Sequence, residues 1–313
     1  MSGGDPSTTA QAARMRGLFH LRTGRPGNAV DAFCESLALE PDDASTHAWL
    51  AIALLGAKRL TAARIEAELA VGMAADAPLP LYALGRVRLG ERRYKDAEET
   101  FRALLAVEPD DPANHRALAE VHVARHRWDD ALATLEQARA LDPDSPDTLG
   151  DIAAVHWERG RPAEAEVAAR AALEASPEHA DALVVMGWVL LRRGEVAEAR
   201  EHAITVLRVQ PSHGGATLLL VGVKARGSWV LGVWWRYNMW MVGLGPRAIT
   251  VMLVGFATYR MVSLLAEDFG PAGLADVIQI LWLAFVAYTW FGPALFRRTL
   301  EKELAPVGLK RDF

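Results

Sequence analysis

Small and apolar residues recur along the first two thirds of the chain with a period of 34 residues. Every period has Gly or Ala at its eighth position and Ala at its twentieth. The seventh position carries Leu, Ile or Met in every period but the first, where Arg16 stands. Such spacing predicts two packed helices joined by a tight turn. The units begin near Ala10, Ala44, Pro78, Pro112, Pro146 and Ala180.

Proline and glycine mark the breaks in this pattern. A proline ends most units, at Pro41, Pro109, Pro143, Pro177 and Pro211. Gly24, Gly160 and Gly194 stand between the two helices of a unit, where a residue tolerant of positive φ suits a helix end. A single hairpin cannot bury its apolar face, so neighbouring hairpins must stack. We therefore predict an all-α solenoid of six helical hairpins, with the first helix of each unit lining a concave face.

The pattern resembles the tetratricopeptide repeat family, whose unit is a 34-residue helical hairpin with small residues at positions eight and twenty and proline near position 32. The resemblance covers residues 10–213. The second unit departs most, with Ala75 for the proline, Lys58 at the turn and Ala67 where a bulky residue is usual. The resemblance implies binding of a protein or peptide partner, and no catalytic chemistry.

The segments that flank the repeats have separate roles. Residues 1–9 are expected to form a disordered tail, and residues 214–227 a helix that caps the last repeat. The next segment, 228–246, is rich in tryptophan and too short to span a bilayer. We expect it to lie in the membrane interface, and packing on the solenoid is the alternative. Its interfacial tryptophans are Trp229, Trp234, Trp235 and Trp240.

Two apolar runs, 248–266 and 277–296, are long enough to cross a bilayer as a hairpin over residues 247–298. Their connecting loop carries Glu267, Asp268 and Asp276 and no Lys or Arg, whereas basic residues flank both runs. Because basic flanks stay on the cytoplasmic side, we expect an integral protein of the bacterial plasma membrane. The repeats, the N-terminus and the tail 299–313 would then be cytoplasmic.

One charged residue, Arg260, lies within the first run, and Asp276 and Gln279 stand at the start of the second. Because an arginine at depth in lipid is costly, we expect Arg260 to pair with Asp276 or Gln279. We interpret these residues as a structural clamp of the hairpin, and a transport role as the alternative. The hairpin could also form homo- or hetero-oligomers.

Charge differs between the two parts of the chain. Residues 1–227 hold 26 Lys and Arg against 33 Asp and Glu, a net charge of −7, and the remainder holds 8 against 6, a net charge of +2. An acidic body does not favour nucleic acid as a partner. The single cysteine, Cys34, excludes an internal disulfide, which is typical of a reducing compartment. The N-terminus shows neither the basic nor the apolar region of a signal peptide.

Candidate chemistry is sparse. His122 and His126 stand four residues apart beside Glu120, as a metal pair on a helix would. However, His122 shares the eleventh position of its unit with His20 and His156, which favours core residues over ligands. The sequence contains no GxxxxGK[ST], GxSxG or CxxC motif. We therefore expect no enzyme activity, no metal and no cofactor.

The concave face is the expected binding surface, through residues at positions two, five, nine and twelve of the first helices. A clamp for chaperone tails is not expected, because Arg14 and Leu18 stand where that clamp needs Lys and Asn. The mixture of Arg, acid and Trp suits a peptide or helix. The candidate residues are Tyr82, Arg86, Arg116, Glu120, Asp147, Trp157, Asp181 and Trp188.

The sequence thus predicts a membrane-anchored scaffold or adaptor that recruits a partner to the bilayer, for example during assembly of a membrane complex. The first alternative is an integral accessory subunit of a channel, transporter or secretion complex. The second is an accessory protein of an enzyme that resides on another chain.

Overall fold

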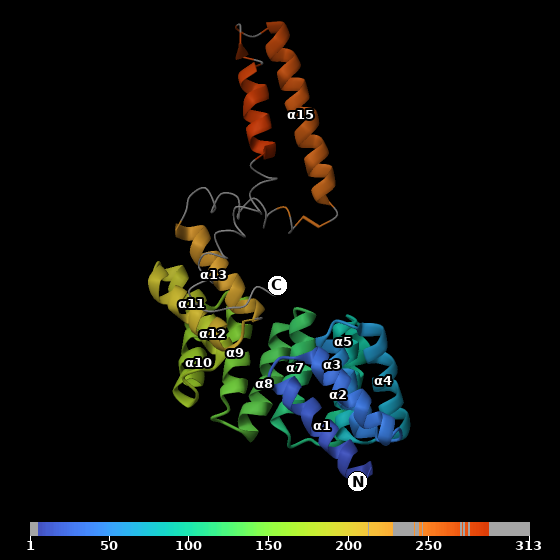
Figure 1. Ribbon diagram of the computed structural model, residues 1–313. Helices are drawn as coiled ribbons and strands as arrows, with labels where there is room; N and C mark the ends of the chain where they lie inside the picture. Colours follow the sequence, from blue (N-terminus) through green and yellow to red (C-terminus); the bar gives the residue numbers. More distant parts are fainter. Residues whose placement is uncertain are drawn as a thin grey trace. The chain divides into compact units, whose positions relative to one another are not determined.

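The computed structural model describes residues 6–211, 213–227, 241, 244–245, 247–269, 271, 273–274 and 276–287 (Figure 1). Every regular element among these residues is a helix. The labelled helices are α1 (Pro6–Arg22), α2 (Pro26–Leu39), α3 (Ala44–Gly56), α4 (Leu60–Met73), α5 (Pro78–Gly90), α6 (Tyr94–Val107), α7 (Pro112–Ala124), α8 (Trp128–Leu141), α9 (Pro146–Glu158), α10 (Pro162–Ala175), α11 (Ala180–Arg193), α12 (Val196–Val209), α13 (Gly214–Gly227) and α15 (Arg247–Phe269).

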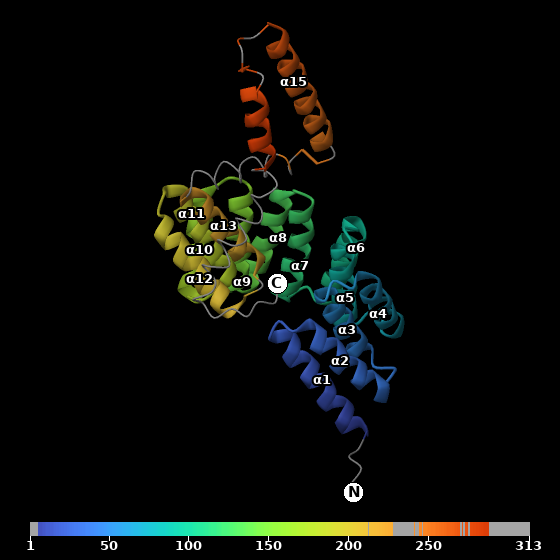
Figure 2. The same cartoon turned by 45° about the horizontal axis from the view of Figure 1, so that its top comes forward.

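The chain forms two compact units, residues 1–185 and residues 186–313. In the first unit, α1 to α10 form five antiparallel hairpins, and each odd-numbered helix from α3 to α9 packs on the hairpin before it (Figure 2). The second unit contains the end of α11 together with α12, α13 and α15. The predicted all-helical solenoid of hairpins is confirmed.

In all six hairpins, the residue at the same position of the turn has a left-handed backbone conformation. The three predicted glycines have φ of 67° at Gly24, 76° at Gly160 and 96° at Gly194. The equivalent residues in the other hairpins also have positive φ, namely Lys58 at 61°, Arg92 at 61° and His126 at 57°. Because non-glycine residues adopt this conformation at some cost, the packing of the two helices dictates the turn.

The first helices begin with side-chain caps and prolines. The carboxylates of Asp43 and Asp111 accept hydrogen bonds from the backbone N–H groups of Ser45, at 3.0 Å, and Ala113, at 2.8 Å. Ser145 caps α9 in a similar way. Proline occupies the first turn of α5, α7 and α9, where its missing N–H group costs nothing. These residues explain why a first helix starts three residues after a proline-marked break, at Ala44, Pro112 and Pro146.

The core of each hairpin depends on a close approach between positions eight and 24. A Cβ atom added to Gly17 would lie 2.5 Å from the Phe33 ring, and one added to Gly85 would lie 2.6 Å from the Phe101 ring. Both rings are fully buried. The other hairpins of the first unit combine alanine at position eight with a smaller residue at position 24: Ala51 with Ala67, Ala119 with Leu135 and Ala153 with Ala169.

The second unit closes its hairpin with α13, whose bounds agree with the expected cap at residues 214–227. A Cβ atom on Gly187 of α11 would lie 2.3 Å from Leu219, and one on Gly222 of α13 would lie 2.8 Å from the Trp188 ring. Nη1 of Arg226 also donates a hydrogen bond to the carbonyl oxygen of Leu191, at 2.7 Å. Helix α13 thus packs closely on α11.

The start of the chain differs from the sequence prediction. Helix α1 begins at Pro6, so residues 6–9 are helical and do not belong to a disordered tail. Ala10 is fully buried, and its carbonyl oxygen accepts a hydrogen bond of 2.9 Å from the Ser36 hydroxyl. This contact with α2 favours extension of the helix ahead of the first repeat.

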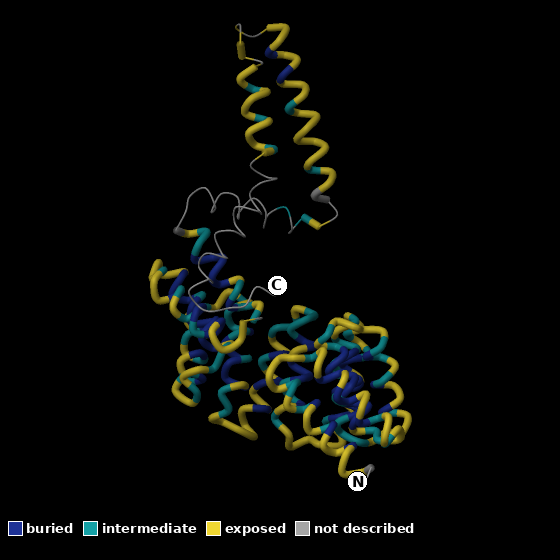
Figure 3. Tube along the Cα trace, in the orientation of Figure 1, coloured by how far each residue is buried: buried dark blue, intermediate teal, exposed yellow. Residues whose placement is uncertain are grey.

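Helix α15 is the one described helix that is long and apolar enough to cross a membrane, over Ile249–Phe269. Most of this helix is exposed, as Figure 3 shows. The exposed residues include Met252, Leu253 and Phe256. A second, shorter apolar helix spans Asp276–Ala287, which is part of the predicted run 277–296. The predicted interfacial helix, with its four tryptophans, lies mostly outside the described residues.

Aromatic rings join these two apolar helices. Tyr259 of α15 stacks on Trp282, with ring centroids 4.5 Å apart and an interplanar angle of 7°. Two small residues on the same side of α15, Ser263 and Ala266, are buried. Among the described residues, no hydrogen bond or ion pair joins the exposed Arg260 to Asp276 or Gln279, so their pairing stays a prediction.

We expect Gly85→Ala to destabilise the solenoid by about 1–3 kcal/mol, because the fully buried Phe101 ring cannot move away from the new methyl group. Thermal unfolding of the full chain measures the effect. Gly72→Ala is the control, because a Cβ atom there meets nothing within 4 Å, and it should be neutral or stabilising by up to about 1 kcal/mol. Phe101→Leu should reduce the cost of Gly85→Ala. Purely additive effects would contradict the proposed contact.

Candidate functional site

The first helices of the third, fourth and fifth hairpins line a cavity of about 380 Å³ in the first unit. Its walls combine apolar and charged side chains. The lining residues are Leu89 of α5; Arg116, Ala119, Glu120, Val123 and Ala124 of α7; Leu135 of α8; and Asp151, Ala154, Val155 and Glu158 of α9. Two of the predicted binding residues, Arg116 and Glu120, line this cavity.

Ion pairs connect the three first helices along this face. Arg86 of α5 donates to the carboxylate of Glu120 on α7. Arg116 of α7 donates from Nη1 to Oδ2 of Asp147, at 2.9 Å, and from Nε to Oδ2 of Asp151, at 2.6 Å, both on α9. Four predicted residues therefore lie in one row of charges across successive repeats. The row holds their side chains in fixed positions around the cavity.

Two residues of this row were missed by the sequence analysis, Asp151 and His179. Asp151 lies four residues after Asp147, on the same face of α9. Nε2 of His179 lies 3.0 Å from Oδ1 of Asp147. The signal for Asp151 was present, because a helical spacing of four residues places it beside a residue already chosen. Nothing in the repeat pattern marks His179.

The two aspartates on α9 have opposite electrostatic environments. Burial raises the pKa of Asp151, and the attraction of Arg116 offsets only part of this effect. Partial burial also raises the pKa of Asp147, but the hydrogen bond from His179 and the charge of Arg116 bring it below its usual value. The cavity thus contains a carboxylate whose charge is unfavourable to the folded state.

The remaining predicted residues lie in different surroundings. Tyr82 is half-buried and packs edge-on against Phe101, with ring centroids 6.3 Å apart. Trp157 is half-buried on α9, and Asp181 is exposed on α11. Trp188 belongs to the second unit, where its ring packs against Gly222. Tyr82 and Trp188 therefore contribute to packing as well as to the surface.

Of the histidines at the eleventh position, His122 is buried, and His20 and His156 are half-buried. His122 is 4% exposed, and burial lowers the pKa of both His122 and His156. The Nδ1 atoms of His20, His122 and His156 are buried without a hydrogen-bond partner among the described residues. His126 lies in the left-handed turn after α7. The described residues contain no group of three or more His, Cys, Asp or Glu side chains suited to a metal ion.

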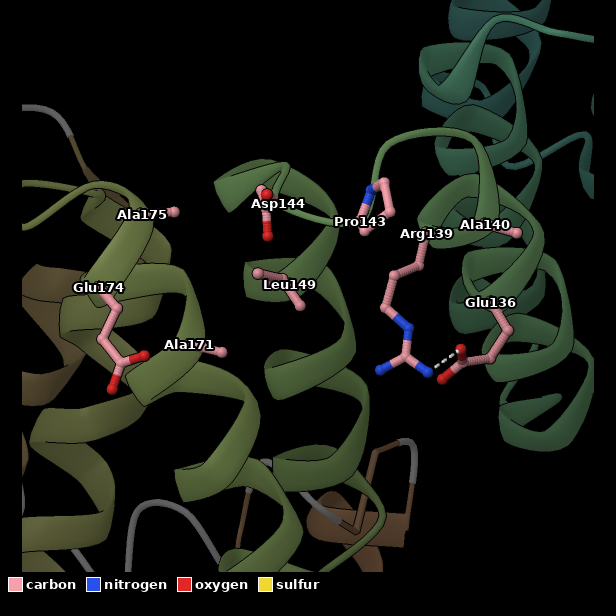
Figure 4. A pocket seen from close by; sticks show the side chains of 9 residues that line it. All are labelled: Glu136, Arg139, Ala140, Pro143, Asp144, Leu149, Ala171, Glu174 and Ala175. Atoms are coloured by element: carbon pink, nitrogen blue, oxygen red, sulfur yellow. Dashed lines mark ion pairs between the residues drawn. The ribbon is translucent and has the colours of Figure 1, made fainter.

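A second hollow lies between the second helices α8 and α10, with a volume of about 780 Å³ (Figure 4). Glu136 and Arg139 of α8 form an ion pair of 2.6 Å on one wall, and Glu174 of α10 stands on the other wall. Leu149 of α9 lies between them. No residue of this hollow was predicted from the sequence, because the concave-face positions belong only to the first helices.

Family models described as tetratricopeptide repeat match residues 14–78, 88–154 and 151–221. No curated protein matches the sequence. A thermophilic TPR protein of Thermus thermophilus has a similar structure, with 23% identity over 58% of this chain and 99% of the other, and a TM-score of 0.55. A tetratricopeptide repeat protein of Parabacteroides merdae gives 15% identity over 69% and 84%, with a TM-score of 0.60. PilW, a type IV pilus biogenesis factor, gives 15% identity over 67% and 98%, with a TM-score of 0.53. At these identities the likeness shows the fold.

We expect Asp151→Asn to improve thermal stability more at pH 7 than at pH 3. The raised pKa means that the contribution of Asp151 to stability is present below its unfolded value of about 3.8 and is lost as pH rises through the folded value. Asp147→Asn is the matched control with the opposite sign, because a lowered pKa stabilises above about 3.8. Melting temperatures at the two pH values test both variants. Equal pH dependence of the melting temperatures of the two variants would contradict the opposite pKa shifts of Asp151 and Asp147.

Proposed function

Because the chain belongs to the tetratricopeptide repeat family, we propose that it is a membrane-anchored scaffold that holds a protein or peptide partner on the face formed by α5, α7 and α9. Proteins of this fold are generally non-enzymatic and act through protein–protein interaction. The observation that carries the proposal is the cavity of about 380 Å³ on this face. Its fixed ion pairs lower the cost of ordering the site when a partner binds.

The lining of the cavity indicates the chemistry of the partner. Leu89, Val123 and Val155 offer an apolar wall to one inserted side chain. Acidic side chains outnumber arginines on this face, with Glu120, Asp147, Asp151 and Glu158 against Arg86 and Arg116. A partner segment with an apolar anchor and neighbouring Lys or Arg residues fits this surface best, because complementary charge steers association.

The exposed apolar surface of α15 supports the anchor. Ile249 is 69% exposed, Met252 60% and Leu253 64%, although each side chain would gain from burial. A contiguous apolar surface of this kind marks contact with a membrane or another protein. In a lipid bilayer, α15 and the following helix would be covered by acyl chains. Anchoring would then raise the local concentration of the bound partner beside other membrane proteins.

The alternative function is that of an accessory subunit in a multi-subunit membrane complex. The observation that favours it is Arg260, which is exposed on α15. If α15 spans the bilayer, this guanidinium group needs a polar partner or access to the headgroups. A neighbouring membrane protein could supply the partner, and such a protein would co-purify with the full chain.

A photocrosslinking experiment tests the binding face. We expect a photoreactive residue at Ala154, in the cavity wall, to form a defined adduct in cells that express the full chain. The same residue at Leu69, on the exposed side of α4, is the control and should form none. Glu158→Lys should weaken the Ala154 adduct, because it reverses a charge at the rim of the cavity. Identical adducts at both positions, or none at Ala154, would exclude this face as the binding site.

A further inference from the structure

The first unit carries opposite charges at the two ends of its hairpins. The hairpin turns, defined as residues 22–26, 56–60, 90–94, 124–128 and 158–162, contain ten Lys or Arg and two Glu. The loops between hairpins, residues 40–43, 74–77, 108–111, 142–145 and 176–179, contain ten Asp or Glu and no Lys or Arg. The separation occurs in a region whose net charge is negative, so it is not a consequence of overall composition.

The hairpin turns lie together on one edge of the first unit. Because the first helices all run in the same direction, every turn after a first helix lies at the same end of the array. Ion pairs between successive hairpins confirm that the turns are neighbours. They are Arg64 with Glu91 at 3.7 Å, Arg125 with Glu98, and Arg159 with Asp129 at 2.5 Å. We call this surface the basic edge.

Helix capping explains the acidic loops but not the basic edge. Asp43 and Asp111 cap the first helices, and an acid at a helix N-terminus is favourable. On the basic edge, however, arginine occupies the N-cap of all five second helices of the first unit, where the helix dipole disfavours a cation. None of these side chains makes a capping hydrogen bond within the described structure. They are Arg25, Arg59, Arg93, Arg127 and Arg161.

Many of these cations lack a counter-ion. Within the described part of the chain, six exposed side chains of the basic edge form no ion pair. They are Arg22, Arg25, Lys58, Arg59, Arg92 and Arg161. These solvated cations come from four of the five hairpins, and three of them, Arg25, Arg59 and Arg161, stand at helix N-caps against the helix dipole. Such a spread of cations is suited to a broad anionic surface rather than to a single carboxylate.

The second unit shows where the chain leaves the solenoid. Its hairpin turn, residues 192–196, carries Arg192 and Arg193. The end of α13 lies beside this turn, because Arg226 bonds to the carbonyl oxygen of Leu191. Helix α13 therefore ends at the hairpin-turn end of this unit, and α15 follows it along the sequence.

We propose that the basic edge binds the anionic phospholipid headgroups of the bilayer in which the chain is anchored. This inference rests on the proposed membrane anchoring. Each cation near an anionic surface multiplies the ratio of bound to free edge about five-fold at low ionic strength, and salt screens the effect. Binding through this edge orients the solenoid on the membrane and leaves the acidic loops on the opposite edge in solvent.

The test uses the full chain in lipid nanodiscs, with a fluorophore on a single cysteine in a Cys34→Ser background. Ala57→Cys places the probe at a hairpin turn, and Ala75→Cys places it in the loop at the other end of the same hairpin. We expect a spin label on the lipid headgroups to quench the Ala57 probe in nanodiscs with phosphatidylglycerol. Quenching should weaken in pure phosphatidylcholine and at high salt, and the Ala75 probe should remain unquenched.

A matched pair of variants isolates the charges. Neutralising Arg25, Lys58, Arg59 and Arg161 to Gln should lower quenching of the Ala57 probe to that of the Ala75 probe. Neutralising Asp42, Asp76, Asp110 and Asp144 to Asn on the opposite edge should leave it unchanged. These acids are exposed and cap no helix, so both variants should retain the helical circular dichroism of the parent.

Two results would overturn the proposal. One is equal quenching of the two probes in anionic nanodiscs while the chain remains inserted, as judged by resistance to alkaline extraction. The other is binding of an RNA oligonucleotide that is lost in the Gln variant, without any edge-dependent quenching, which would assign the basic edge to nucleic acid. Failure of the chain to insert would instead contradict the proposed membrane anchoring.

Discussion

The close approach of two helices at the eighth position of each hairpin is the constraint on which the rest of the structure depends. Gly17 and Gly85 leave no room for a methyl group beside the rings of Phe33 and Phe101. A larger residue would separate the helices, and every later hairpin stacks on the surface so formed. The spacing of α5, α7 and α9, and with it the cavity between them, follows from this packing.

The stacked array also arranges charge into rows. A side chain on one first helix faces the equivalent side chain on the next, so Arg86 meets Glu120 and Arg116 meets Asp147 and Asp151. Desolvation of the half-buried Asp151 raises its pKa, so its charged form is less favourable in the folded state. Unfavourable groups of this kind are common where a surface serves binding rather than stability. The basic edge has the same character, since its N-cap arginines act against the helix dipole.

The hairpins and the bounds of the cap helix could be predicted because the period of the repeats is strict, and the period fixes which residues share a face. The left-handed φ of Lys58, Arg92 and His126 could not, because it follows from helix packing and not from residue type. The pairing of Arg260 stays a prediction, since it depends on how the two apolar helices are rotated about their axes. The structure shows the Tyr259–Trp282 stack between them. The net charge along the chain conceals the basic edge, because the cations of successive turns are 34 residues apart and alternate with the acidic loops.

Hydrogen exchange of the full chain, measured by mass spectrometry in nanodiscs and after removal of lipid, tests the central claim most directly. The central claim is that the solenoid is stabilised by its own packing and is joined to an anchor embedded in lipid. It predicts that amides in α3, α5, α7 and α9 exchange slowly in both states, because neighbouring hairpins protect them. Amides in α15 should exchange slowly only in lipid. Equal protection of α15 after removal of lipid would show that protein covers this helix, and would contradict the account.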